Sequence, residues 1–204
     1  ERVLYSSSLK DIMLQIKNGE ELISFEKPGP KEYIYFEPAK TKVAIVTCGG
    51  LCPGLNNVIR GLVTHLWNRY GVTNIGLNPA NQIPFVNLDP DLVDDIHKDG
   101  GTMLGSSRGE QPVEAIVDTL ERNNINILFC VGGDGTLRGA HGIYKEIERR
   151  GLKIGVAGVP KTIDNDINYI DKSFGFESAF TAAQSIILNA HYEAKGVQNG
   201  IALI

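Results

Sequence analysis

The chain has 204 residues, of which 42% are hydrophobic and 22% are charged, close to the average of globular domains. This composition excludes a disordered chain, and no apolar run reaches the about 18 residues that a membrane-spanning helix needs. Lysine and arginine number 20 against 24 aspartates and glutamates, and the resulting net charge of −4 argues against nucleic acid as a partner. Glycine, with 23 residues, is in excess, so its distribution is informative.

Residues 1–42 differ in pattern from the rest and are expected to form an N-terminal helical extension. Four apolar residues recur at the spacing of an amphipathic helix, which Gly19 would end. These residues are Leu9, Ile12, Met13 and Ile16. The stretch that follows is rich in proline, lysine and glutamate, so we expect this extension to pack on a domain rather than to form one.

From Val43 onward, short apolar runs alternate with helical patterns. The expected strands are 43–47, 125–131, 154–157 and 200–204, and the expected helices include 58–66, 113–120 and 180–188. Such alternation predicts an α/β domain over residues 43–204, a Rossmann-like three-layer fold with a parallel sheet covered by helices. In such sheets ligands bind at the carboxyl ends of the strands, so the loops after Thr47, Val131 and Ala157 are candidate sites.

The first of these loops holds three glycines within six residues, Gly49, Gly50 and Gly54, and leads into a helix. Glycines let the backbone approach a ligand closely, and the helix start presents free N–H groups. A plain turn needs only one glycine, so the spacing favours a phosphate cradle.

The second loop begins at Gly132 and places Asp134 between two glycines. An acidic residue there would repel phosphate unless a cation intervenes, which favours a Mg²⁺ ligand, although a simple helix cap is the alternative. Gly133, Gly135 and Gly139 also form a GxGxxxG pattern, which keeps a dinucleotide-binding dehydrogenase open as a weak alternative.

The third loop, residues 160–166, brings two carboxylates, an amide, a hydroxyl and an ammonium into seven residues. A base that accepts a hydroxyl proton and a cation that neutralises phosphoryl charge are the parts of phosphoryl transfer. An Asx-rich surface turn is the alternative. A further loop, residues 100–109, adds four glycines and Arg108, whose guanidinium is a candidate bidentate donor to phosphate oxygens.

Four segments together resemble the phosphofructokinases, in that family's order and with its spacing over most of residues 43–204. They are residues 47–56 (TCGGLCPGLN), 100–108 (GGTMLGSSR), 132–136 (GGDGT) and 160–166 (PKTIDND). The third segment alone would not identify the family, because NAD kinases and diacylglycerol kinases share it.

The resemblance implies phosphoryl transfer from ATP to the 1-hydroxyl of fructose 6-phosphate in glycolysis, with Mg²⁺ as cofactor. It implies that Asp164 is the base and that Lys161 and Gly135 are further catalytic residues, with Asp134 as the metal ligand. Residues implied in substrate binding are Thr162, Ile163, Asp164 and Asp166. Residues implied around ATP are Gly49, Arg108, Gly109, Gly133, Asp134, Gly135 and Thr136.

The family divides by phosphoryl donor, and two positions bear on the choice. Pyrophosphate users carry an aspartate where Gly135 stands, and glycine leaves open the space of the ATP α-phosphate. Lys161 resembles the pyrophosphate branch, so the pair resembles ATP-dependent members of that branch. A pyrophosphate-dependent phosphotransferase is the main alternative, and a regulatory subunit without catalysis is a remoter one.

The resemblance also implies a longer enzyme, because the family continues into a second domain that binds the sugar phosphate. We therefore expect residues 43–204 to be the donor-binding domain of a homodimer or homotetramer. The odd number of cysteines favours reduced thiols and a cytoplasmic location.

Overall fold

A computed structural model describes residues 2–27, 29, 31–77, 86–106, 109 and 111–204. The chain divides into two compact units, Glu1–Tyr35 and Phe36–Ile204. The expected domain boundary at residue 42 stays a prediction.

The first unit contains the amphipathic helix that the sequence predicts. Helix α1 spans Leu9–Asn18 and ends at Gly19, whose left-handed backbone (φ 70°) caps it as expected. Strand β1 (Arg2–Leu4) pairs antiparallel with β2 (Ser24–Glu26). None of the helix residues is buried, so the apolar face of α1 is exposed.

The second unit is built on a five-stranded sheet with the order β5-β4-β3-β6-β7. The strands are β3 (Lys42–Thr47), β4 (Asn74–Leu77), β5 (Val86–Leu88), β6 (Ile127–Gly132) and β7 (Gly155–Pro160). Four strands are parallel, as predicted, but β5 runs antiparallel to β4. Only eight residues separate those two strands, fewer than a parallel crossover requires.

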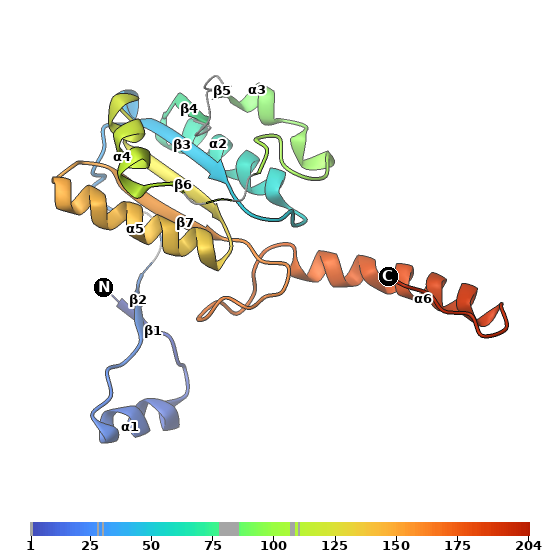
Figure 1. The fold of residues 1–204 in the computed structure, drawn as a ribbon. Helices are drawn as coiled ribbons and strands as arrows, with labels where there is room; N and C mark the ends of the chain where they lie inside the picture. Colours follow the sequence, from blue (N-terminus) through green and yellow to red (C-terminus); the bar gives the residue numbers. More distant parts are fainter. Residues whose placement is uncertain (1, 28, 30, 78–85, 107–108, 110) are drawn as a thin grey trace. The chain divides into compact units, whose positions relative to one another are not determined.

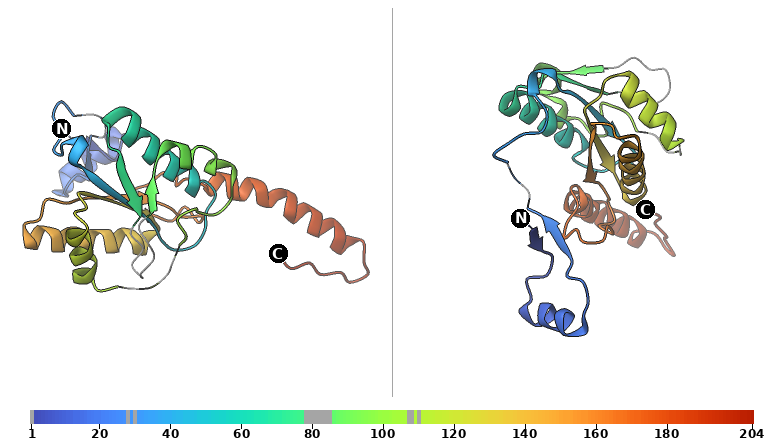
Figure 2. Two further views of the ribbon diagram at one scale, coloured as in Figure 1. Left: turned by 90° about the horizontal axis from the view of Figure 1, so that it is seen from above. Right: turned by 90° about the vertical axis from the view of Figure 1, so that its left-hand side faces the viewer.

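Helices cover both faces of this sheet, which confirms the three-layer prediction (Figures 1 and 2). On one face lie α2 (Leu55–Tyr70), α3 (Pro90–Val93) and the short 3-10 helix Ile96–Lys98. On the other lie α4 (Val113–Arg122) and α5 (Asp134–Arg150). A further 3-10 turn, Pro38–Lys40, precedes β3.

Alternate residues of β3 face two separate cores. Val43 and Ile45 are fully buried and pack with Ile59 of α2, whereas Ala44 packs with Val117 of α4 and with residues of α5. Burial on both faces explains why this strand is a continuous apolar run rather than an alternating one.

The predicted strand at residues 200–204 is wrong, because this segment has no regular structure. Ile201 and Leu203 are 93% and 99% exposed, and no described strand lies beside them to provide hydrogen bonds. The predicted helix at 180–188 exists within α6 (Phe176–Lys195), but none of its residues is buried, so its apolar face covers no core.

No helix in the described ranges is long and apolar enough to cross a bilayer.

Candidate functional site

The three predicted loops meet at one edge of the sheet because β3, β6 and β7 are adjacent and parallel (Figure 1). Two backbone hydrogen bonds continue the strand pairing into the loops. The Cys48 N–H donates to the Val131 carbonyl at 2.9 Å, and the Lys161 N–H donates to the Gly132 carbonyl at 2.9 Å. The backbones that carry the candidate residues are thus fixed by the sheet.

The first glycine loop leads directly into α2. Gly49 (φ 82°) and Gly54 (φ 94°) both have left-handed backbones, a conformation that glycine adopts without steric cost. Gly54 is the N-cap of α2 and supplies no side chain, so the loop ends in a helix terminus with free backbone donors. This geometry suits an anion, and the phosphate cradle at this loop stays a prediction.

The second loop is shorter than the sequence suggests, because α5 already begins at Asp134. Gly132 lies so close to the Thr136 side chain that a β-carbon there would collide with it, whereas a β-carbon on Gly135 would meet nothing within 4 Å. The space beside Gly135 is therefore open. Gly139 lies inside the helix, away from the turn.

The Asp134 carboxylate is 65% exposed and forms an ion pair with Arg138 one helical turn later. No group of three His, Cys, Asp or Glu side chains that could enclose a metal occurs in the described part of the chain. Mg²⁺, however, commonly takes one or two carboxylates and completes its shell with water and substrate phosphates. Asp134, exposed at a helix start, fits that way of holding the ion.

The third loop is organised by hydrogen bonds around Thr162. The Thr162 hydroxyl donates to the Asp166 carboxylate at 2.8 Å and accepts from the Asp164 N–H at 3.1 Å. The buried Ser173 hydroxyl donates to the Thr162 carbonyl at 2.5 Å. Thr162 is 9% exposed, whereas the Asp164 side chain lies at the surface. The arrangement holds Asp164 at a fixed backbone position while its carboxylate stays accessible.

Asn165 connects the third loop to the segment that follows it. Its side chain donates to the Asp171 carbonyl at 3.1 Å and accepts from the Ser173 N–H at 2.7 Å, and its backbone is left-handed (φ 54°). Sequence reasoning gave Asn165 and Ser173 no individual role. Asn165 lies within the PKTIDND segment, and Ser173 begins the segment 173–177 (SFGFE), which also resembles the family; these resemblances are the sequence signal for the two residues.

Lys161 connects all three loops. Its ammonium donates to the Gly50 carbonyl at 2.5 Å and lies 3.6 Å from where a β-carbon on Gly49 would be. The Lys161 carbonyl oxygen lies 3.3 Å from where a β-carbon on Gly133 would be. The residue is only 6% exposed. No described carboxylate forms an ion pair with it, and a buried cation is costly without a negative partner.

Residues 99–106 lie against the first glycine loop. The Ser106 hydroxyl donates to the Gly49 carbonyl at 2.5 Å, and the Thr47 hydroxyl bonds the Gly105 carbonyl. Arg108, predicted to bind phosphate, lies outside the described residues. Gly109 is described and has a positive φ of 142°.

The three cysteines are free thiols in or near this region. Burial raises the pKa of the Cys130 thiol to about 12, and burial also raises the pKa values of Cys48 and Cys52. Such thiols are protonated and unreactive near neutral pH, which suits a structural role.

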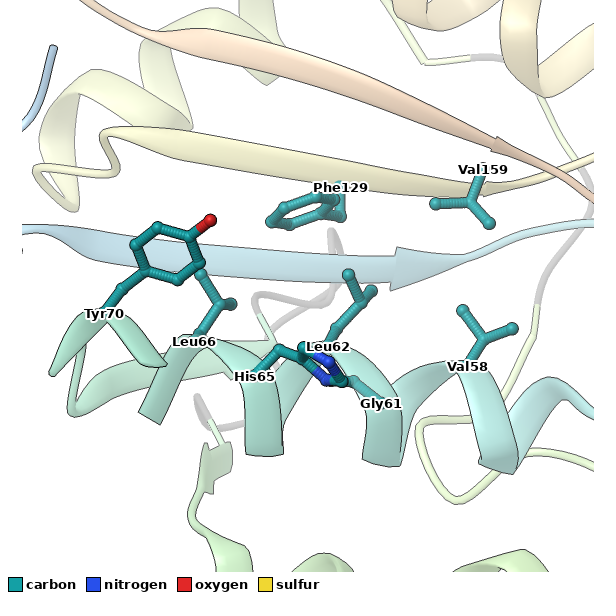
Figure 3. A pocket seen from close by; sticks show the side chains of 8 residues that line it. All are labelled: Val58, Gly61, Leu62, His65, Leu66, Tyr70, Phe129 and Val159. Carbon is teal, nitrogen blue, oxygen red and sulfur yellow. The ribbon is translucent and has the colours of Figure 1, made fainter. Parts of the chain in front are cut away.

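A separate apolar groove of about 440 Å³ lies between α2 and the sheet (Figure 3). Leu62 and Leu66 of α2 point toward Phe129 of β6. The other lining residues are Val58, Gly61, His65, Tyr70 and Val159. This lining carries neither glycine-loop backbone donors nor a lysine or arginine, so the groove does not suit a phosphate.

Comparison with known proteins gives consistent results. The family described as Phosphofructokinase matches residues 42–204. The ATP-dependent 6-phosphofructokinase of Borreliella burgdorferi is 56% identical over 193 residues, covering 90% of this chain and 43% of that protein. The enzyme of the same name from Entamoeba histolytica is 51% identical over 205 residues, covering 97% and 46%. This chain thus spans less than half the length of these relatives.

Solved structures share the fold. A pyrophosphate-dependent phosphofructokinase from Nitrosospira multiformis superposes with a TM-score of 0.66 at 20% identity, over 77% of this chain and 42% of that one. The phosphofructokinase from Saccharomyces cerevisiae gives 0.62 at 23% identity, over 77% and 25%. These two likenesses bear on the fold alone.

Proposed function

This chain belongs to the phosphofructokinase family, and we propose that it is the donor-binding part of an ATP-dependent 6-phosphofructokinase. The enzyme transfers a phosphoryl group from ATP to the 1-hydroxyl of fructose 6-phosphate. The names of the relatives that share about half of this sequence support the proposal. The weak alternative of a dinucleotide-binding dehydrogenase loses its support, because its glycine pattern lies in a segment that the family match includes.

The observation that carries the proposal is the burial of Lys161 where the three loops meet. Its ammonium has three N–H donors, one of which the Gly50 carbonyl accepts. The remaining donors, together with the free N–H groups at the starts of α2 and α5, suit an anionic group of high charge. A triphosphate has this chemistry, and its transferring phosphoryl group gains negative charge that a fixed cation stabilises.

On the acceptor side, we assign Asp164 as the general base. Its carboxylate is exposed, while its N–H is held by the Thr162 hydroxyl at 3.1 Å. Such a residue can accept the proton of the sugar 1-hydroxyl as that oxygen attacks phosphorus. Thr162 and Asp166 then keep the loop in place, and Ile163, exposed between them, contacts the sugar.

On the donor side, Gly133, Gly135 and Thr136 surround the phosphates at the start of α5, and Asp134 holds the cation. Bound Mg²⁺ neutralises phosphate charge and keeps the donor oxygens in one orientation. Asp134 pairs with Arg138 in this structure, and a bound Mg²⁺ would replace that cationic partner. The open space beside Gly135 accommodates the α-phosphate of ATP, which favours ATP over pyrophosphate.

Activity assays with ATP and with pyrophosphate, run side by side on the full-length protein, test this proposal. We expect fructose 1,6-bisphosphate to form with ATP and Mg²⁺, and not when the metal is chelated. Turnover with pyrophosphate and not with ATP would contradict the donor assignment. No turnover with either would contradict the function.

Replacement of Asp164 by Asn tests the assignment of the base. The change keeps the shape of the side chain but removes its capacity to accept a proton, so we expect kcat to fall by about 10² to 10⁴ with ATP affinity retained. Asp171→Asn is the matched control, because Asp171 is an exposed aspartate in the segment that follows the third loop. Equal activity of the two variants would exclude Asp164 as the base.

We further propose a cytoplasmic homodimer or homotetramer. The three free thiols support a reducing compartment. Light scattering of the full-length protein after size-exclusion chromatography tests the assembly, and a monomeric mass would contradict it.

A further inference from the structure

Asn56 is a buried polar residue in the first turn of α2, with 3% of its surface exposed. Buried amides are hydrogen-bonded in native proteins, and this one has both of its functions satisfied. Its Nδ2 donates to the Asp99 carbonyl at 3.1 Å, and its Oδ1 accepts from the Met103 N–H at 2.8 Å. Because one partner is an acceptor and the other a donor, only this orientation of the amide satisfies both.

The partners of Asn56 lie 43 and 47 residues later in the chain. One side chain therefore fixes both ends of the segment 99–103. Asp99 is the C-cap of the 3-10 helix Ile96–Lys98, and its N–H donates to the Ile96 carbonyl at 3.2 Å. Residues 100–103 lie in neither helix nor strand, so their position depends on anchors such as Asn56.

Three further contacts fix the continuation of the segment. The Thr47 hydroxyl bonds the Gly105 carbonyl and lies 3.3 Å from the Thr102 hydroxyl, and the Ser106 hydroxyl donates to the Gly49 carbonyl at 2.5 Å. Residues 99–106 thus run alongside the segment that leads from the end of β3 through the first glycine loop into α2. Asn56 anchors the beginning of this contact, and Ser106 anchors its end.

From these contacts we infer that Asn56 is a positioning residue for the phosphoryl donor. It holds the 99–106 segment beside the Gly49–Gly54 loop, so that the two glycine-rich segments present one surface to the donor phosphates. The inference rests on the proposed function, which assigns the donor to this edge of the sheet. Asn56 itself touches no substrate.

The test compares Asn56→Ala with Asn57→Ala in the full-length protein. Asn57 is the matched control because it has the same residue type, lies next in the same helical turn and is exposed. Loss of both anchoring hydrogen bonds should raise KM for ATP, and the dissociation constant for Mg-ADP in calorimetry, about tenfold. KM for fructose 6-phosphate should stay within about twofold, because residues 162–166 do not contact this anchor.

A purely structural role predicts a different result. It would lower the thermal midpoint of Asn56→Ala while leaving both KM values equal to those of Asn57→Ala, and this outcome would overturn the inference. An equal rise in KM for both substrates would overturn it as well.

Two other variants test the inference if Asn56→Ala does not fold. Asn56→Asp keeps the acceptor for the Met103 N–H but opposes the Asp99 carbonyl with a negative oxygen, so it should raise KM for ATP in the same direction. If neither variant folds, Ser106→Ala decides, because this side chain is exposed and, among the described residues, its loss removes the bond to Gly49. An unchanged KM for ATP in Ser106→Ala would then overturn the inference.

The wild-type protein separates this inference from the proposed function. If it uses pyrophosphate, the KM values of Asn56→Ala and Asn57→Ala are compared with pyrophosphate as the donor. The role of Asn56 is then tested independently of donor identity. If it shows no turnover, the proposed function fails while the Mg-ADP titration still tests Asn56. A wild-type protein that binds neither Mg-ADP nor pyrophosphate overturns both.

Discussion

Replacement of Gly175 by Ala should destabilise the protein by an amount that can be worked out from two terms. Gly175 is the N-cap of α6, with a left-handed backbone of φ 83°. A β-carbon there costs about 1–2 kcal/mol in backbone strain. It would also collide with the Pro53 carbonyl oxygen and the Cys52 sulfur, and overpacking of this kind costs about 1–3 kcal/mol.

The total, about 2–5 kcal/mol, is a large part of the 5–15 kcal/mol that stabilises an average domain. The collision is hard to relieve because it involves backbone, and the Cys52 thiol already donates to the Phe174 carbonyl at 3.2 Å. The same contact joins the first glycine loop to the segment that follows the third loop. Gly175→Ala should therefore also weaken substrate binding.

The matched control is Gly151→Ala. Gly151 has a similar backbone conformation (φ 65°) at the end of α5, but a β-carbon there would meet nothing within 4 Å. Its cost should be the strain alone, about 1–2 kcal/mol. Urea unfolding followed by circular dichroism measures both variants. Equal destabilisation of the two would refute the contact between Gly175 and Pro53.

Three further predictions concern stability. Ile59→Ala, which empties a fully buried site, should cost about 2–5 kcal/mol in urea unfolding, and Ile59→Val only about 0.5–1.5. Ser173→Ala should cost about 1–3 kcal/mol in the same assay, because a buried carbonyl loses its donor. Hydrogen bonds from Arg149 and Arg150 lower the pKa of Glu146 from 4.5 to about 2. Its stabilisation is therefore present above pH 4.5 and lost as the pH falls toward 2, so the unfolding midpoint of Glu146→Gln should vary less over that range than that of the wild type.

The central strands could be predicted from sequence because their signal is local. Val43 and Ile45 belong to an uninterrupted apolar run, and a strand buried on both faces needs one. The run at 200–204 looks the same in sequence but forms no strand here. A strand requires a partner for its backbone, and the presence of a partner is a property of the fold that composition does not encode.

The positions of the candidate loops could also be predicted, since parallel strands carry their loops to one edge. The connections among those loops could not. The bond from Lys161 to Gly50 spans 111 residues, and the bond from Asn56 to Met103 spans 47. Only the packed structure shows that Lys161, which the resemblance assigns to catalysis, also donates a hydrogen bond to the first glycine loop.

The pairing of β6 with β7 limits which sequence changes the protein can accept. Gly132 pairs with Pro160, and the next residue of β7's chain, Lys161, bonds back to Gly132. Successive residues of a strand point to opposite faces, so a single-residue deletion within β7 would turn Lys161 away from Gly50. Insertions are better accommodated in surface connections such as the turn after Gly151. Variation in length should therefore accumulate at the amino-terminal edge of the parallel strands, while the strand interiors keep a constant count of residues.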